Sequence, residues 1–179
     1  MTQFSRFVVS ALPRSGSAWV AALFNLGERV FCMHEGISNP KIRDFPGHID
    51  TLFDSYDYVG DCCGTYTDPR RPTPRRCAWI ERNEEDCLIS SEIAIERQMD
   101  PKRWRFFLEL KREWIAKHQP FIINFDQLFT MGGAFALWME MVDVEFPAKK
   151  VEVLLEQNIQ RNVLSYDMQL VTERIINHQ

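Results

Sequence analysis

The sequence lacks the patterns that define several common protein classes. Its 179 residues include five cysteines, an odd number, and none form a CxxC pair, so neither a disulfide framework nor a zinc site is predicted. No apolar run approaches the roughly 20 residues that a membrane-spanning helix needs. No secretory signal is visible at the N-terminus. We therefore expect a reducing, cytoplasmic environment and no membrane partner, with most of the cysteines acting as small buried hydrophobes.

The net charge of the chain argues against a general nucleic-acid-binding protein. The net charge of −4 gives no general electrostatic case for nucleic-acid binding, and no nucleic-acid partner is expected. Basic residues gather only locally, at Arg70, Arg71, Arg75 and Arg76. A composition of 45% hydrophobic and 26% charged residues is that of an ordinary globular protein, and the length predicts one domain over residues 1–179.

The most informative segment lies near the N-terminus. Residues 7–12 form an apolar run that predicts a fully buried strand. The turn at residues 13–16 follows, and residues 17–24 are predicted to be a helix with Ser17 as its cap. A strand, a glycine turn and a helix start bring backbone N–H groups and the positive end of the helix dipole together. We therefore expect a phosphate site here, with Arg14 as an added cation.

The rest of the chain alternates between the two kinds of element. Further strands are predicted over residues 29–33, 57–62, 76–81 and 120–125, and helices over residues 84–99, 101–118, 133–142, 147–156 and 161–177. Residues 37–55 and 65–74 are predicted loops, the first with at most one helical turn. The crossovers are long enough for parallel pairing, so we expect a three-layer, doubly wound parallel α/β sheet of about five strands with a helical C-terminal third.

Large apolar side chains within the predicted helices are interpreted as core rather than as ligand platforms. The residues concerned are Trp104, Phe107, Leu108 and Ile115, which share their helical spacing with Lys111, and the later group Trp138, Met139 and Met141.

The phosphate loop does not have the pattern of common nucleotide hydrolases. A triphosphate-binding P-loop requires a lysine and a magnesium-binding hydroxyl directly after its last glycine. Here Ser17 and Ala18 follow Gly16, and the cation, Arg14, precedes it. This argues against ordinary ATP or GTP hydrolysis. A purely structural turn remains the alternative interpretation.

A second candidate group follows the predicted strand at residues 76–81. Arg82 ends that strand, and Ser90 lies eight positions later on the next helix. The carboxyl ends of strands form the ligand-binding edge of such sheets, so Arg82 and Ser90 would suit a second phosphate group. The alternative is that Arg82 pairs with the acids at residues 84–86.

Together these segments resemble the PAPS-dependent sulfotransferase family. The 5′-phosphosulfate loop of that family has Lys or Arg, Ser or Thr, Gly, two hydroxyl residues and Trp, and residues 14–19, RSGSAW, match all positions but one. Its 3′-phosphate motif has an arginine at a strand end and a serine eight positions later, as Arg82 and Ser90 are here. Residues 121–128, FIINFDQL, are more weakly similar to the late strand of the family, which ends in a Tyr-Glu-Asp-Leu type of sequence.

The resemblance implies a P-loop-like fold and transfer of a sulfuryl group from PAPS to a hydroxyl or amine of an unknown acceptor, without a metal, leaving PAP. Cofactor binding is implied for Arg14, Ser15, Gly16, Ser17, Ala18, Trp19, Arg82 and Ser90. Trp19 would lie against the adenine or, equally, in the core. The chain departs from the family at Ala18, where a hydroxyl is usual, and at Glu84, where proline is usual. The loops within residues 37–74 and the last helix are expected to form the acceptor pocket.

An acceptor hydroxyl also needs a general base. Glu35 is the preferred candidate, His34 the second and Asp61 the third, each of them equally a solvated strand-end residue. Arg14 would assist by stabilising the leaving phosphate. Two other classes stay open: a P-loop kinase or other nucleotide phosphotransferase, and a catalytically degenerate module that binds a nucleotide or a protein. Association into a homo-oligomer stays open as well.

Overall fold

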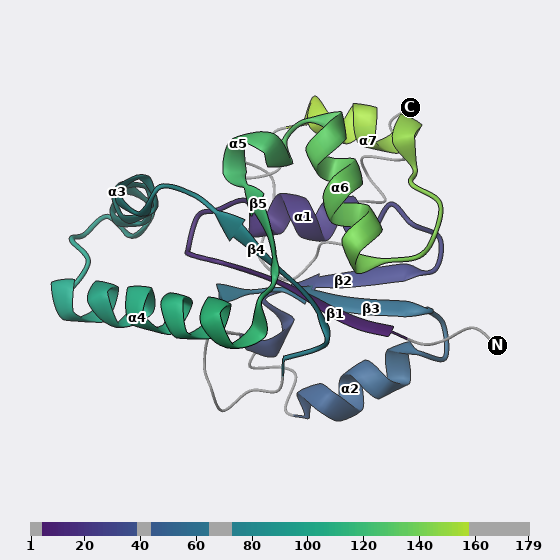
Figure 1. The fold of residues 1–179 in the computed structure, drawn as a ribbon, viewed down its shortest axis with the longest axis horizontal. Helices are drawn as coiled ribbons and strands as arrows, with labels where there is room; N and C mark the ends of the chain where they lie inside the picture. Colours follow the sequence, from purple (N-terminus) through teal and green to yellow (C-terminus); the bar gives the residue numbers. More distant parts are fainter. Residues whose placement is uncertain (1–4, 39–43, 65–72, 158–179) are drawn as a thin grey trace.

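The computed structural model describes residues 5–38, 44–64 and 73–157 (Figure 1). Its strands are β1 (Ser5–Ala11), β2 (Val30–His34), β3 (Tyr58–Cys62), β4 (Arg76–Glu81) and β5 (Phe121–Asn124). Its helices are α1 (Ser17–Phe24), α2 (Phe45–Leu52), α3 (Glu84–Ile95), α4 (Pro101–His118), α5 (Phe125–Leu128), α6 (Met131–Met141) and α7 (Ala148–Leu155), with a 3-10 helix at Gly36–Ser38. Within the described part, no helix is long and apolar enough to cross a membrane.

The five strands form one parallel sheet with the order β2-β3-β1-β4-β5. The central strand, β1, pairs with β3 and β4 on its two sides, so that Val9 lies opposite Cys62 and Ala78. Every residue of β1 from Phe7 onward is buried. A run without polar alternation is what a parallel strand needs when helices cover both of its faces.

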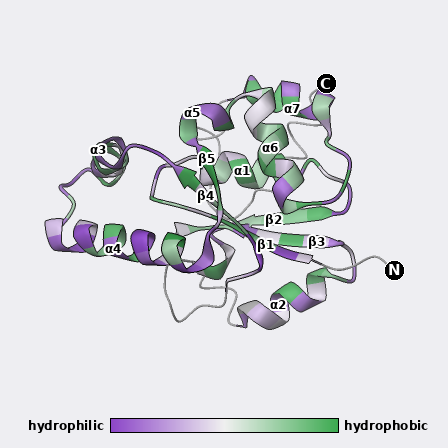
Figure 2. Cartoon of the chain, viewed as in Figure 1, coloured by the Kyte–Doolittle hydropathy of each residue, from purple (hydrophilic) through white to green (hydrophobic). Residues whose placement is uncertain are grey.

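Helices cover both faces of the sheet, and alternate residues of the strands face the two layers. On one face, Phe7 and Val9 pack with α1, α6 and α7. On the other, Val8 and Trp79 pack with α3 and α4, while α2 covers Val59 through Ile49. Hydrophobic residues follow the central strands and α1, and hydrophilic residues cover much of α4 (Figure 2). The predicted α/β class is confirmed, and the all-parallel sheet is compatible with the doubly wound arrangement.

Helix α1 is apolar on all sides because it lies between the sheet and the outer helices. Its residues from Trp19 to Phe24 are all buried, and the ring of Phe24 stacks on Trp138 with centroids 5.6 Å apart. The core interpretation of Trp138 and Met141 is therefore confirmed. For Met139 it is wrong: that side chain is 48% exposed, because it lies on the opposite side of α6.

Several predicted boundaries are wrong. Within residues 37–55, expected to be mainly loop, α2 forms an eight-residue helix because the carboxylate of Asp44 caps it by accepting from the N–H of Gly47. Helix α3 ends at Ile95 rather than at 99, since Glu96 adopts a left-handed conformation. Strand β5 is shorter than predicted and leads directly into α5. The predicted helix at 161–177 lies outside the described residues.

The close packing at the sheet centre predicts the effect of one substitution. A Cβ atom at Gly60 would lie 2.2–2.6 Å from ring atoms of Phe7, which is itself 2% exposed. We expect Gly60→Ala to lower the free energy of unfolding by about 2–3 kcal/mol, measured by urea denaturation. The matched control is Gly132→Ala in α6, where no atom lies within 4 Å; it should be neutral or stabilising by up to about 1 kcal/mol. Equal effects of the two substitutions would contradict the packing argument.

Candidate functional site

The candidate site lies at the carboxyl ends of β1 and β4, which are neighbours in the sheet. After β1 the chain passes through α1 to β2 on one side of the sheet, and after β4 it passes through α3 and α4 to β5 on the other (Figure 1). Right-handed crossovers in opposite directions place these helices on opposite faces. Open parallel sheets bind their ligands at the point where the connections diverge in this way.

The loop between β1 and α1 has an unusual backbone. Arg14 and Gly16 both adopt left-handed conformations, with φ of 67° and 82°. Gly16 also lies against α5 and the residue after it: a Cβ there would be 3.1 Å from Phe129 and 3.3 Å from Leu128. A non-glycine residue such as Arg14 in this conformation costs energy and is found preferentially at functional sites. This loop is therefore a candidate binding element rather than an ordinary turn.

Helix α1 begins with unsatisfied backbone donors. Gly16 takes the cap position with no side-chain cap, and in the described part of the chain the N–H groups of Gly16, Ser17 and Ala18 donate to no protein acceptor. The prediction that Ser17 caps the helix is wrong, because Ser17 is already its first residue and its hydroxyl contacts Nε2 of His34 at 3.1 Å. Free N–H groups and the positive end of the helix dipole together favour an anion.

Arg82 joins the two strand ends. Its guanidinium donates to the backbone carbonyl of Arg14 and lies 4.3 Å from the ring centroid of Phe125. The alternative in which Arg82 pairs with residues 84–86 is not what the structure has, since none of these acids forms an ion pair with it in the described part. The guanidinium of Arg82 thus lies at the loop that carries the free N–H groups, and the same loop includes Arg14; such a combination suits a phosphate or sulfate group.

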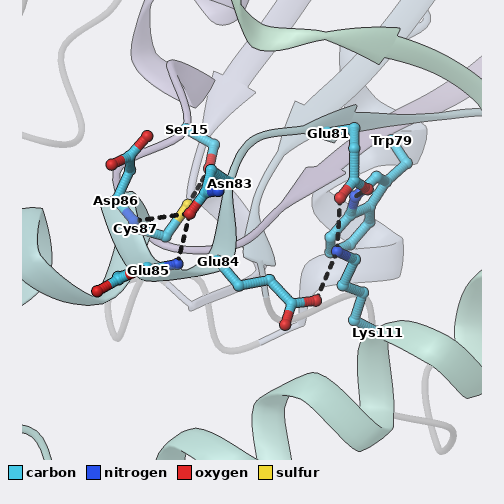
Figure 3. A network of polar contacts seen from close by, with 9 residues as sticks. All are labelled: Ser15, Trp79, Glu81, Asn83, Glu84, Glu85, Asp86, Cys87 and Lys111. Carbon is cyan, nitrogen blue, oxygen red and sulfur yellow. Dashed lines mark hydrogen bonds and ion pairs between the residues drawn. The ribbon is translucent and has the colours of Figure 1, made fainter.

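A buried lysine holds the connection after β4 (Figure 3). Nζ of Lys111 on α4 donates to Oε1 of Glu81 at 2.7 Å and to Oε1 of Glu84 at 3.0 Å, and Nε1 of Trp79 donates to the other oxygen of Glu81 at 2.9 Å. Burial alone would lower the pKa of Lys111, but its hydrogen bonds with the two carboxylates and their charges raise it. Sequence reasoning missed this network; the only signal was a lysine within the apolar spacing of the 101–118 helix.

Helix α3 packs directly on the loop. Oγ of Ser15 and Sγ of Cys87 are 3.2 Å apart, and both residues are fully buried. Asn83 caps α3, accepting from the N–H groups of Glu85 and Asp86 (Figure 3). Half-buried Ser90 lies three residues after Cys87, on a neighbouring side of the helix. The two predicted phosphate-binding segments, far apart in sequence, are therefore in contact. All five cysteines are buried and none of them forms a disulfide within the described residues, and their burial agrees with the prediction that most of them pack as small hydrophobes.

The structure separates the three candidate bases. His34 contacts Ser17 at the start of α1, as described above. Glu35 has a left-handed backbone, with φ of 56°, and its carboxylate accepts no hydrogen bond in the described part of the chain. Asp61 is buried, and its carboxylate accepts from the N–H groups of Gly36 and Ile37, each at 2.9 Å. His34 thus has a hydrogen-bond contact with the first residue of α1, whereas Asp61 holds the turn after β2.

Trp19 has a packing role. It is 4% exposed and meets the edge of Phe129, with ring centroids 5.2 Å apart. Phe129 in turn packs on Phe125, so aromatic rings connect α1 to the residues beneath Arg82. The position favours the core interpretation of Trp19 over a place against the adenine.

The described residues contain a groove of about 620 Å³ between α3 and α4. Its apolar lining includes Leu88, Met99, Trp104 and Leu108, with charged side chains such as Arg105 at its edge. The groove is not at the place predicted for the acceptor pocket. Much of that predicted pocket, namely residues 39–43, 65–72 and 158–179, lies outside the described part.

Comparisons with family models, curated proteins and solved structures find no match to this chain. The functional interpretation therefore depends on the residues and their geometry. What they provide is a set of backbone donors, two arginines and several hydroxyl groups around one strand edge. Such a set can bind two anionic groups of one ligand and orient them.

The burial of Asp61 predicts a pH dependence of stability. Burial, and to a smaller extent the negative charge of Glu35, raise the pKa of Asp61 from 3.8 to about 7, although backbone N–H groups oppose the shift. Between these two values the folded protein binds a proton that the unfolded chain does not. Stability should therefore fall as the pH rises from about 4 to about 7, by roughly 2–4 kcal/mol from this group.

Urea denaturation of the wild-type protein and of Asp61→Asn across this pH range measures the effect. The free energy of unfolding of Asp61→Asn should depend less on pH, because the asparagine does not titrate. The substitution also removes one of the two acceptor oxygens that hold Gly36 and Ile37, which lowers stability at every pH. Parallel pH profiles for the two proteins would show that Asp61 does not titrate in this range.

Proposed function

We propose that this protein has a P-loop-like fold and is a sulfotransferase, which transfers a sulfuryl group from PAPS to a hydroxyl or amine of an acceptor and releases PAP. The observation that supports it most is the left-handed loop at the end of β1, with free N–H groups and with Arg82 bonded to its carbonyl. The resemblance of residues 14–19 and of Arg82 with Ser90 to the family motifs supports the same conclusion.

The 5′ side of the cofactor would bind at the start of α1. The N–H groups of residues 16–18 would donate to the 5′-phosphate, and the Arg14 guanidinium would lie beside it. As the acceptor oxygen bonds to sulfur, the bond from sulfur to the bridging phosphate oxygen breaks, and its electron pair leaves with PAP. Fixed donors aimed at this oxygen stabilise the developing charge. Ala18 can supply its backbone N–H although it lacks a hydroxyl.

The 3′-phosphate would bind to Arg82 and Ser90. The guanidinium has five N–H donors, of which the bond to the Arg14 carbonyl uses a single one. Its contact with the Phe125 ring restricts the side chain before a ligand binds, which lowers the entropy lost on binding. Two phosphate positions on neighbouring strand ends fit a nucleotide with phosphates at both its 3′ and 5′ positions.

His34 is the general base that the geometry supports best. Its Nε2 lies 3.1 Å from Oγ of Ser17, at the point where the sulfuryl group would extend from the 5′-phosphate. In the reaction, this nitrogen would take the proton of the acceptor hydroxyl as that oxygen attacks sulfur. This places His34 before Glu35, the reverse of the order expected from the sequence.

Binding of PAP tests the proposal directly. In calorimetric titrations without magnesium, we expect the wild-type protein to bind PAP and both Arg14→Ala and Arg82→Ala to lose affinity by about tenfold or more, because each removes a charged donor. Arg75→Ala is the matched control, since this exposed arginine lies at the opposite end of β4 and should leave binding unchanged. Absence of binding to the wild-type protein would overturn the sulfotransferase proposal, while a need for magnesium would favour a phosphotransferase.

The role of His34 is tested by separating turnover from binding. With labelled PAPS and an acceptor identified by screening, His34→Gln should lower kcat by about 100-fold or more while PAP affinity stays within a factor of about three. Glu35→Gln is the comparison, and it should retain most of the activity. A large loss in Glu35→Gln and none in His34→Gln would assign the base to Glu35 instead.

A further inference from the structure

Lys111 contacts both residues that border the short connection carrying Arg82. Glu81 ends β4 and Glu84 begins α3, with Arg82 and Asn83 between them. Lys111 is only 7% exposed, and its ammonium group lies within hydrogen-bond distance of both carboxylates. One side chain from α4 therefore fixes the two ends of the β4–α3 connection (Figure 3).

The carboxylate of Glu84 is expected to disfavour anion binding at this edge of the sheet. It lies two positions after Arg82, and an uncompensated carboxylate there would repel a phosphate bound to the guanidinium. In the structure its side chain extends toward Lys111, whereas Glu85 and Asp86 extend away from that lysine and are exposed (Figure 3). Of these three acids Glu84 is the one that is only partly exposed, so solvent and salt screen its charge less than the charges of Glu85 and Asp86.

Glu81 would also repel a bound phosphate if its carboxylate had no hydrogen-bond partners. One of its oxygens accepts from Lys111 and the other from the indole of Trp79, so both of its oxygens are engaged and its orientation is fixed. The lysine also lies 5.9 Å from the centroid of the Trp79 ring. An ammonium group between two carboxylates lowers the local negative charge at the end of β4.

We propose that Lys111 is a positioning residue for anion binding: its charge offsets one of the two negative charges of Glu81 and Glu84 and holds both carboxylates by hydrogen bonds, which leaves Arg82 available to a phosphate group. This inference rests on the proposed function, because it concerns the second phosphate position of the same site. It explains how the chain tolerates an acid where the resembled family has proline. Lys111 acts through these acids and does not itself contact the ligand.

The experiment compares Lys111→Met with the double variant Lys111→Met/Glu84→Gln, using PAP and inorganic sulfate as separate probes in calorimetric titrations. Lys111→Met should bind PAP about tenfold more weakly than the wild-type protein. The added Glu84→Gln should recover most of the lost affinity, because it removes the negative charge that Lys111 no longer offsets. Lys117→Met is the matched control on the same helix, where the lysine is exposed. It should bind like the wild-type protein.

Two results would overturn the inference. One is a folded Lys111→Met variant with unchanged affinity, and the other is a double variant as weak as the single one. If Lys111→Met does not fold, the triple variant Glu81→Gln/Glu84→Gln/Lys111→Met removes all three charges of this cluster. It should bind PAP at least as tightly as the wild-type protein, because it lacks the net negative charge of the cluster, and weaker binding by the folded triple variant would overturn the inference.

The two probes separate this inference from the proposed function. Binding of sulfate but not PAP, with the expected dependence on Lys111, would overturn the sulfotransferase proposal and support the role of the lysine. Binding of PAP without dependence on Lys111 would support the sulfotransferase proposal and overturn the role of the lysine. If the wild-type protein binds neither probe, both are overturned.

Discussion

The burial of β1 between two layers of helices determines where the other elements of the fold must lie. The strand is apolar on both faces, so it requires α1 on one side and α3 with α4 on the other. Its carboxyl end must then emerge at the edge where the connections to these layers diverge. The position of the loop between β1 and α1 is therefore a consequence of core formation, and the loop is supported on both sides by buried elements.

Packing and charge meet at the same place. Phe125, at the start of α5, and Phe129, just after it, both lie against Gly16. Phe125 also lies beneath Arg82, so the core supports both the loop backbone and the guanidinium. Lys111 stabilises the neighbouring charges, since it forms ion pairs with the carboxylates of Glu81 and Glu84. A site built this way keeps its donors oriented before any ligand binds, which the proposed function would require.

Much of the fold could be predicted from the sequence because it follows from local patterns. Continuous apolar runs of strand length, such as residues 7–12, mark buried parallel strands, and strong caps such as Asp100 mark helix starts. Errors arose where a local pattern competes with a side-chain bond: Asp44 stabilises α2 despite Pro46 and Gly47. The wrong assignment of Met139 arose because apolar character alone does not tell which side of a helix faces the core.

The kinds of chemical group at this edge could be predicted from the sequence, because Arg14, Gly16, Arg82 and the hydroxyl groups follow predicted strands in chain order. Which of these groups meet became evident only from the folded structure. Contacts between Ser17 and His34, Arg82 and Arg14, or Lys111 and Glu84 join residues 17, 68 and 27 positions apart. No local pattern encodes such pairs, because they depend on strand order and on the side of the sheet to which each helix returns.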